Sequence, residues 1–491
     1  MAALCRDAAT QFALVAEAFG VIVSAAMKML SAKAKINGLT LIKVIVLFLL
    51  ADFNRATAQG LAFSTNTYST VWSGPSCVVA ADVNGDGYLD LVSGNGNPNS
   101  ITVLTNNGSG GFAYRTSLIM ARFPQFIQAA DMNGDGRVDL TCAAGTNLVV
   151  MTNNGASSFG SNATIMVQSA QTSVPCFITV DVNNDGKLDF VCVNNNIQGG
   201  SPALTVLTNN GSGVYGSNAM LIVGDQPLFV AAADINGDGY LDLVSANYGA
   251  SSLTVLTNNG LGIFGSNATL NPGGRPYCVA AASIRNNGKV DLISANAVGN
   301  TLTVLTNNGS GVFGSNATLV VGNGPSFVVA ADLNGDGYAD LISAGLNTGA
   351  PLTVFTNDGS GVFGFNTTLK VGVFVGGGAR CVIAADLNND GKMDLVAANS
   401  GGNTLTVLLN TSPFQPPAAN PPLSLNWRSN RMNVTWPSTS PGWSLQETPN
   451  LMATNWLPSG YAGYSIVDDG TNKELTCPFP TGSRFFRLLH P

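Results

Sequence analysis

Eighteen of the 21 acidic residues between positions 59 and 420 belong to one short pattern, D-x-N-x-D-G-x-x-D, which occurs six times. In its first copy, Asp82, Asn84, Asp86 and Asp90 place side-chain oxygens at odd positions, and the carbonyl of Tyr88 completes the series. Hard oxygen donors at these offsets suit Ca²⁺, and a glycine at the sixth position allows the sharp turn that such a loop needs. The pattern therefore predicts a calcium-binding loop.

The other five complete copies are expected to bind Ca²⁺ in the same way, which makes about six sites in the chain. Their predicted ligands, with the seventh position contributing its carbonyl, are Asp131, Asn133, Asp135, Arg137 and Asp139; Asp181, Asn183, Asp185, Lys187 and Asp189; Asp234, Asn236, Asp238, Tyr240 and Asp242; Asp332, Asn334, Asp336, Tyr338 and Asp340; and Asp386, Asn388, Asp390, Lys392 and Asp394. An EF-hand is excluded because the glutamate at position 12 is absent and strands flank the loops. Three carboxylates in one loop repel one another, so we expect calcium to hold each hairpin together.

A further copy of the pattern is broken. Ser283, Arg285 and Asn287 replace its first three ligands, and only Asp291 remains. The guanidinium of Arg285 is expected to take the place of the cation and keep the loop balanced in charge. This loop, in the fifth repeat, is therefore predicted to hold no metal.

The seven copies mark seven repeats of a longer unit, because their starting residues are spaced 49, 50, 53, 49, 49 and 54 residues apart. A unit contains four short segments rich in β-branched residues, such as LTVLTN at 302–307 and FGSNATL at 313–319, and Asn308-Gly309 between them is a hairpin turn. Four strands in about 50 residues, repeated seven times, favour propeller blades over an open solenoid. We predict an all-β chain: a seven-bladed β-propeller over residues 59–412, followed by a small β-sandwich-like domain.

The two ends of the repeat array support a closed ring. Residues 62–72 match the fourth strand of a unit, whereas the last unit stops after its third strand, LTVLLN at 405–410. The N-terminal strand is therefore expected to complete the last blade. Closure would remove the unpaired strand edges that an open array exposes.

Residues 1–58 have the layout of a secretory signal. Lys28, Lys33 and Lys35 precede an apolar run from Val44 to Ala51, and an A-x-A cleavage site at 56–58 follows. The run is too short for a stable membrane span, so we predict export, with a retained anchor as the alternative. The residues before the signal favour a translation start at Met27 or Met29.

The end of the chain differs in composition from the repeats. Residues 413–422 are rich in proline and are interpreted as a stiff linker. Residues 423–491 alternate polar and apolar residues, which predicts a small β-rich domain, and they contain four of the five tryptophans, Trp427, Trp436, Trp443 and Trp456. We expect these tryptophans to pack in a core, with carbohydrate binding as the alternative.

The cysteines and the single histidine argue against catalysis. Cysteines stand five residues before the motif in three repeats, where other repeats have phenylalanine: Cys77, Cys278 and Cys381 against Phe126, Phe229 and Phe327. Equivalent positions in different blades are too far apart for a disulfide, so we expect buried free thiols. The sole histidine, His490, lies beside the C-terminus and no nucleophile–base arrangement is evident. We expect a protein that is not an enzyme, with a hydrolase as the least favoured reading.

The units resemble FG-GAP (VCBS-type) repeats, the family that builds the integrin α-subunit propeller and many bacterial exported proteins. The resemblance covers residues 60–412, with Phe159-Gly160, Phe264-Gly265, Phe313-Gly314 and Phe363-Gly364 as the Phe-Gly pairs and the turns before Pro227, Pro276 and Pro325 as the second part of the motif. It implies calcium in the loops between first and second strands, on one face of the disc. It also implies that partners bind the opposite face through the loops that include Asn95–Ser100, Asn194–Pro202, Asn247–Ser251, Asp225–Pro227, Gly273–Pro276 and Val373–Arg380.

The predicted function follows from these features. Since the acids are concentrated in the loops and no basic patch is present, nucleic acid is excluded as a partner. We predict a monomeric bacterial protein, secreted or at the cell surface, that acts as an adhesion or recognition module for an extracellular protein or glycan of unknown identity. A lectin-like carbohydrate binder and a purely structural surface component are the alternatives.

Overall fold

The computed structural model describes residues 61–413, except 69–70, 156–157, 168–172, 196–201, 212–213, 286, 323, 348–349 and 372–377, and the backbone of seven strands between Ser424 and Leu489. These residues form strands and turns but no helix, so none of them forms a helix that could cross a membrane. The predicted signal segment, residues 1–58, lies outside the described residues, as does the predicted linker from residue 414 onward.

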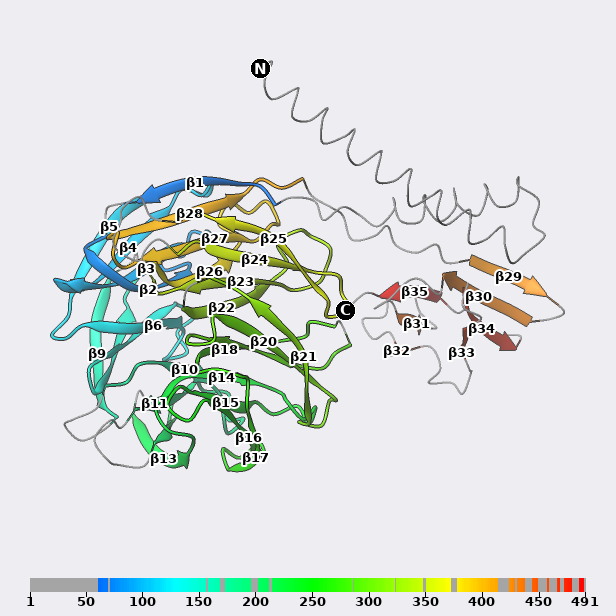
Figure 1. The fold of residues 1–491 in the computed structure, drawn as a ribbon, viewed down its shortest axis with the longest axis horizontal. Coiled ribbons are helices and arrows are strands. Elements are labelled where there is room, and N and C mark those ends of the chain that lie inside the picture. Colours follow the sequence, from blue (N-terminus) through cyan, green and yellow to red (C-terminus); the bar gives the residue numbers. More distant parts are fainter. Residues whose placement is uncertain are drawn as a thin grey trace, which may run out of the picture. The chain divides into compact units, whose positions relative to one another are not determined.

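Strands β1 to β28 form seven four-stranded antiparallel sheets arranged around a common axis, as a seven-bladed propeller (Figure 1). The first three blades consist of β2 (Ser73–Ala81), β3 (Asp90–Asn97), β4 (Asn99–Asn106) and β5 (Phe112–Ile119); β6 (Pro124–Ala130), β7 (Asp139–Ala144), β8 (Asn147–Asn153) and β9 (Phe159–Met166); and β10 (Phe177–Val180), β11 (Asp189–Asn194), β12 (Ala203–Asn209) and β13 (Tyr215–Ile222). The next three consist of β14 (Pro227–Ala233), β15 (Asp242–Asn247), β16 (Ser252–Asn258) and β17 (Phe264–Leu270); β18 (Pro276–Ala282), β19 (Asp291–Asn296), β20 (Thr301–Asn307) and β21 (Phe313–Val320); and β22 (Pro325–Ala331), β23 (Asp340–Gly345), β24 (Leu352–Asn357) and β25 (Phe363–Leu369).

The seventh blade joins the two ends of the propeller sequence. It contains β26 (Ala379–Ala385), β27 (Asp394–Asn399), β28 (Thr404–Asn410) and the N-terminal strand β1 (Phe63–Tyr68), which lies beside β28 in Figure 1. The two strands are antiparallel, with Phe63 opposite Asn410 and Tyr68 opposite Leu405. The predicted closure is confirmed, although the strand ends at Tyr68, short of the predicted residue 72.

The burial of each strand follows from its place in the blade. The second and third strands, such as β15 and β16, are buried along almost their whole length because neighbouring blades cover both faces. The fourth strand, such as β21, is largely exposed because it forms the rim. The core therefore consists of layers between blades; one of them joins Val244 and Leu253 of the fourth blade to Val279 and Leu292 of the fifth.

The innermost strands begin earlier than predicted. In five blades the strand starts at or before a proline, as at Pro227, and the register then shifts by one residue before the segment that resembles FVVAA. The shift is a β-bulge, which adds an unpaired residue and redirects side chains at the end of a strand. The innermost strand of the seventh blade, β26, has the same register shift but begins at Ala379 and not at a proline.

The C-terminal segment also consists of strands. One sheet has the order β29 (Ser424–Arg428), β30 (Arg431–Pro437), β34 (Asn472–Pro478) and β33 (Ile466–Asp468). The other has the order β32 (Leu457–Pro458), β31 (Ser444–Thr448) and β35 (Phe485–Leu489). Two antiparallel sheets agree with the predicted β-rich segment, and their packing as a sandwich stays a prediction.

Candidate calcium loops and recognition face

Each complete acidic loop connects the first and second strands of a blade and is built on its first aspartate. Asp82 accepts hydrogen bonds at Oδ1 from the amides of Gly85 and Asp86, at 2.7 and 3.2 Å, and at Oδ2 from the amide of Gly87, at 2.8 Å. Gly87 has a φ of 88°, which explains the glycine at the sixth position. The first carboxylate therefore organises the turn and keeps acceptor capacity at Oδ2.

The third and fifth positions lie side by side in this turn. The Asn84 Oδ1 atom accepts the Asp86 amide at 2.8 Å, and Asn84 Nδ2 lies 2.9 Å from Asp86 Oδ2. The other five complete loops repeat the side-chain contact at 2.8 to 3.3 Å. In all six complete loops, the side chains of the third and fifth motif positions therefore lie together.

The ninth aspartate lies at the base of the loop. The carboxylate of Asp90 is fully buried and accepts the amides of Val83 and Asn106, at 3.2 and 2.8 Å. Burial raises its pKa to about 6; the two backbone hydrogen bonds oppose the rise, and the charges of Asp86 and Asp82 add to it. The pKa of the equivalent carboxyl is raised for the same leading reason to about 7 at Asp340 and about 6 at Asp394. Each loop thus brings together carboxylates that destabilise one another when all are charged.

The donor set fits a calcium ion in its chemistry. In the described residues, no group of three or more His, Cys, Asp or Glu side chains is by itself arranged as a metal site. The loop set differs from such a group because it needs the asparagine oxygen and the seventh carbonyl as well as carboxylates. Calcium at these positions remains a prediction.

The seventh position divides the six loops into two kinds. In three of them it is basic, and its side chain lies 3.6 to 3.9 Å from the fifth aspartate: Arg137–Asp135, Lys187–Asp185 and Lys392–Asp390. In the other three it is a tyrosine, and the ring of Tyr240, for example, occupies the space beside Gly260, where a Cβ atom would collide with it. The tyrosine loops contain three carboxylates and no basic residue, so they carry the larger negative charge.

The broken loop of the fifth blade supplies its own cation. Arg285 Nη2 lies 2.8 Å from Asp291 Oδ1 and Nε lies 3.3 Å from Oδ2, while Nη2 also donates to the carbonyl of Asn307 at 2.7 Å. Lys289 Nζ donates to the carbonyl of Asn308 at 2.6 Å. The structure pairs Arg285 with the one aspartate that remains in the loop. That the guanidinium takes the place of a cation, and that this loop holds no metal, stay predictions.

Sequence reasoning missed the residue that joins each loop to its neighbour. The asparagine at the end of each third strand donates its backbone amide to the ninth aspartate of its own blade, at 2.6 to 2.9 Å. Its Nδ2 group donates to the carbonyl of the second motif residue in the preceding blade, as Asn258 does to Val182 at 2.8 Å. Asn106 closes the circle by donating to Leu387 of the seventh blade at 2.7 Å. The signal was the asparagine that ends LTVLTN in three units and the equivalent segment in the other four.

Side chains of two kinds alternate around the axis of the propeller. The residue five positions before each motif is, in blade order, Cys77, Phe126, Cys176, Phe229, Cys278, Phe327 and Cys381. The Phe229 ring contacts the Phe126 and Phe327 rings edge to face, with centroids 6.1 and 5.6 Å away. The six described cysteines outside the C-terminal strands are buried and free, as predicted, and burial raises the pKa of Cys278 and Cys381 to about 12. Such thiols are poor nucleophiles at neutral pH.

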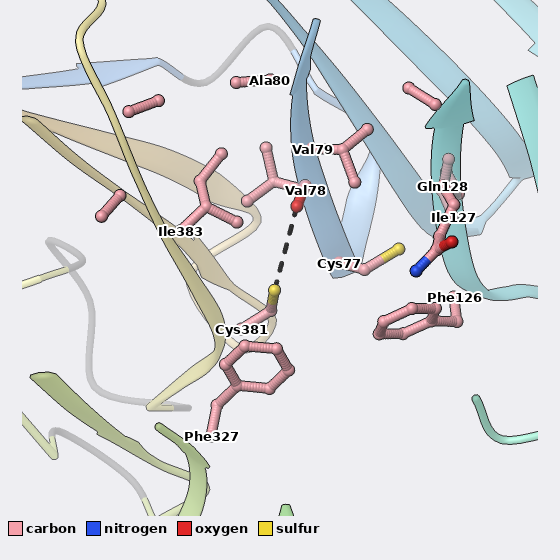
Figure 2. A pocket seen from close by; sticks show the side chains of 13 residues that line it. Cys77, Val78, Val79, Ala80, Phe126, Ile127, Gln128, Phe327, Cys381 and Ile383 are labelled. Carbon is pink, nitrogen blue, oxygen red and sulfur yellow. Dashed lines mark hydrogen bonds between the residues drawn. The ribbon is translucent and has the colours of Figure 1, made fainter. Parts of the chain in front are cut away.

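Because seven is an odd number, the alternation must fail once. It fails between the seventh and first blades, where Cys381 and Cys77 are neighbours, and a cavity of about 410 Å³ lies there (Figure 2). Its lining is apolar except for Gln128, whose Oε1 accepts the amide and hydroxyl of Thr179 at 2.8 and 2.7 Å. Among the described residues that line the cavity, none is acidic or basic.

The loops at the other end of the blades meet in pairs. Tyr248 donates its amide to the carbonyl of Gln226 at 2.9 Å, which joins a loop between second and third strands to one that enters the blade. The Arg275 guanidinium lies 5.3 Å from the centre of the Tyr248 ring, and the Tyr277 ring lies 6.2 Å from it. The structure therefore groups Tyr248 and Arg275 at this end of the blades, whereas Arg380 lines a cavity at the axis.

Comparison with known proteins agrees with this architecture. The family described as FG-GAP-like repeat matches residues 82–142, 131–192, 181–245, 234–294, 284–343 and 332–397, six matches that together span well over half of the chain. The chain belongs to the FG-GAP-like repeat family, and its fold is the integrin α-like seven-bladed propeller.

Solved structures share the fold at low sequence identity. The structure described as BBS1N in complex with ARL6DN, soaked with lead, is 13% identical with a TM-score of 0.52, over 73% of this chain and 99% of that one. A lection of Agrocybe aegerita, described as recognising non-reducing terminal N-acetylglucosamine, is 22% identical with a TM-score of 0.42, over 63% of this chain and 81% of that one. No curated protein matches the chain. The first of these similarities supports the fold alone.

Proposed function

We propose that this chain is a secreted or cell-surface calcium-binding propeller that recognises an extracellular protein or glycan and catalyses no reaction. Calcium stiffens one end of the ring, and ligand binds the other. The observation that carries the proposal is the difference between these two ends.

The motif end is uniform. Its seven first-to-second-strand loops have the same length, and the same asparagine links each of them to a neighbouring blade. The opposite end varies from blade to blade. Its second-to-third-strand connection is residues 145–146 in the second blade, 248–251 in the fourth and 195–202 in the third. Variable loops on a rigid scaffold are where binding proteins carry their specificity.

The calcium part of the proposal is tested by counting ions and by melting the full chain with and without a chelator. Six complete loops predict about six Ca²⁺ per chain. Removal of the ions leaves three carboxylates crowded in each loop, and in the three tyrosine loops no basic residue of the loop offsets their charge, so the melting temperature should fall steeply. Fewer than three ions, or an unchanged melt in EDTA, would overturn the role of calcium.

The recognition part needs a ligand screen. Immobilised protein is tested for saturable binding to a glycan array and to a panel of extracellular proteins, beside the variant Tyr248→Ala, which removes the ring under Arg275. A glycan hit that this variant loses supports the lectin-like form, and a protein hit supports adhesion. Absence of any saturable ligand would leave a structural surface component, and turnover on polysaccharide or phosphoester substrates would reveal a hydrolase.

A further inference from the structure

A ring of redirected side chains surrounds the axis on the proposed recognition face. In six blades the β-bulge of the innermost strand inserts one residue directly before the Cys/Phe ring: Ser76, Gln125, Leu228, Tyr277, Ser326 and Arg380. Pro175 takes this position in the third blade. All seven line one cavity of about 80 Å³, hereafter the axial cup. A bulge redirects the extra residue, which explains how two successive residues reach the cup in five of the six bulged blades; the fifth blade contributes Tyr277 alone.

The floor of the axial cup is apolar. It consists of the rings of Phe126, Phe229 and Phe327 with the thiols of Cys77, Cys176 and Cys381. Four of these residues also line the larger cavity: Phe126, Phe327, Cys77 and Cys381. The Phe229 ring contacts the rings of Phe126 and Phe327 edge to face, so the three rings form one continuous apolar surface. A water molecule takes roughly 30 Å³ in the liquid. The cup therefore has room for the head of one side chain.

Two polar atoms in the wall of the cup lack partners. Ser326 is only 1% exposed, and its hydroxyl forms no hydrogen bond within the described part of the chain; nor does Gln125 Oε1. The serine at the same position in the first blade differs, because the Ser76 hydroxyl lies 2.6 Å from the carbonyl of Pro124 and 3.2 Å from that of Gly94. Buried polar groups are normally paired, so an unpaired hydroxyl in a cavity wall points to a missing polar partner.

The charge of the cup selects the partner. Arg380 is the only charged residue among those that line it, and among the described residues no carboxylate lies within ion-pair distance of its guanidinium. A guanidinium presents two parallel N–H donors that match a carboxylate. The phenyl rings can contact methylene groups, and the arginine can pair with a carboxylate. The lining of the cup therefore suits a carboxylate on a short aliphatic chain.

We infer that the axial cup binds an acidic side chain of a partner protein. In this arrangement Arg380 pairs with the carboxylate, the Ser326 hydroxyl donates to it, and the methylene groups lie on the three phenyl rings. The inference rests on the proposed recognition function and names the chemistry of its ligand. The cup would act as the central anchor, while the surrounding loops contact the rest of the partner surface.

The test uses the full chain with small probes that differ in one charge. Binding of N-acetyl-glutamate methylamide and of its glutamine counterpart is measured by saturation-transfer NMR, with glucuronate as a third probe. The glutamate probe is expected to bind at least about tenfold more tightly than the glutamine probe, the effect of one charge-assisted pair. Equal binding of the two would overturn the inference, and binding of glucuronate alone would replace a protein partner with an acidic glycan.

Variants locate the binding. Arg380→Gln should abolish binding of the glutamate probe, and Ser326→Ala should weaken it severalfold. Arg275→Gln is the matched control, because this exposed arginine stacks on Tyr248 and does not line the cup. All three variants should keep the melting temperature of the parent chain. Unchanged probe binding by Arg380→Gln would contradict the inference. If Tyr248→Ala loses a partner found in the screen and Arg380→Gln has no effect, the proposed function stands and only the role of the cup is refuted.

Discussion

The loops of the fourth and fifth blades perform the same structural task with opposite charge. In the fourth, Asp234, Asp238 and Asp242 lie in one loop without a basic residue. In the fifth, the single remaining aspartate is paired to Arg285. The ninth aspartate nevertheless accepts the same asparagine amide at 2.7 Å in both blades. The comparison teaches that the fifth loop carries a counter-charge in one of its own side chains, whereas the fourth loop contains none; under the proposed function, calcium supplies it there.

The joint to the preceding blade is likewise the same in both. Asn258 donates to Val182 at 2.8 Å, and Asn307 donates to Ile235 at 2.6 Å. The fifth blade thus stays in the ring although its loop lacks the acidic motif. Neutralisation of the loop and linkage of the blades are separable, which makes each open to a separate test.

The largest effect of a single substitution is expected from Arg285→Gln. It leaves Asp291, which is fully buried, without its counter-charge, and the free energy of unfolding should fall by about 3 kcal/mol. Denaturant unfolding should show the loss with and without calcium. Arg137→Gln, which removes an exposed pair, is the control and should change stability little. An equal effect of the two variants would show that Arg285 is no substitute for a cation.

Asn258→Leu is expected to have the next largest effect. The variant keeps the volume but leaves the carbonyls of Val182 and Leu241 without a donor, and the cost should be about 2 kcal/mol. Denaturant unfolding measures it, and the loss should persist in saturating calcium. Asn259→Asp is the control, because it keeps the exposed oxygen that accepts the Leu261 and Ile263 amides. A loss that calcium rescues would place the asparagine in the loop and not in the blade joint.

The dependence of stability on pH should have a defined sign in the chelated protein. Burial raises the pKa of Asp340 to about 7, and those of Asp90 and Asp394 to about 6, above the value near 3.9 of an unfolded chain. The folded state therefore binds protons more tightly, so stability is greatest below about pH 4 from this source and is lost as the pH rises to about 7. Thermal melts in EDTA at pH 5 and pH 8 measure the slope. Asp340→Asn should flatten it, and a chelated protein that is more stable at pH 8 would contradict the assignment.

The smallest effect concerns the seventh position of the loops. Tyr240→Lys would bring a positive charge beside Asp238, as in the third blade, where Lys187 lies 3.8 Å from Asp185. Calcium titration should show a loss of affinity at that loop of about twofold to fivefold, which high salt removes because the pair is exposed. Tyr240→Phe is the control and should leave the affinity unchanged. A salt-independent change would indicate a packing effect on Gly260 instead.

The spacing of residues along the chain was sufficient to predict the blades, the closure of the ring and the charge balance that Arg285 provides in the broken loop. Each of these depends on residues that are close in the chain or on a pattern that recurs with a fixed period. The division of the loops by Tyr, Arg or Lys at the seventh position is also visible in the sequence, but its energetic meaning needs the 3.6 to 3.9 Å contacts to the fifth aspartate.

The inter-blade asparagines and the axial cup could not be predicted in the same way. Asn258 reaches a carbonyl 76 residues away, and the cup needs one residue from each of seven bulged or displaced strand starts. No periodicity within a unit shows which side chains of different blades meet at the axis. The Cys/Phe alternation is visible in the sequence, but only the closure of the ring brings Cys381 beside Cys77.

The sequence by itself thus determined the repeat, the acidic loops and the number of blades, because strand propensity, turn residues and ligand spacing act over a few neighbouring positions. Tertiary structure alone decided how the loops are linked into a ring and what lies at its centre. The physical reason is that closure of seven blades around one axis brings into contact residues that no local interaction relates.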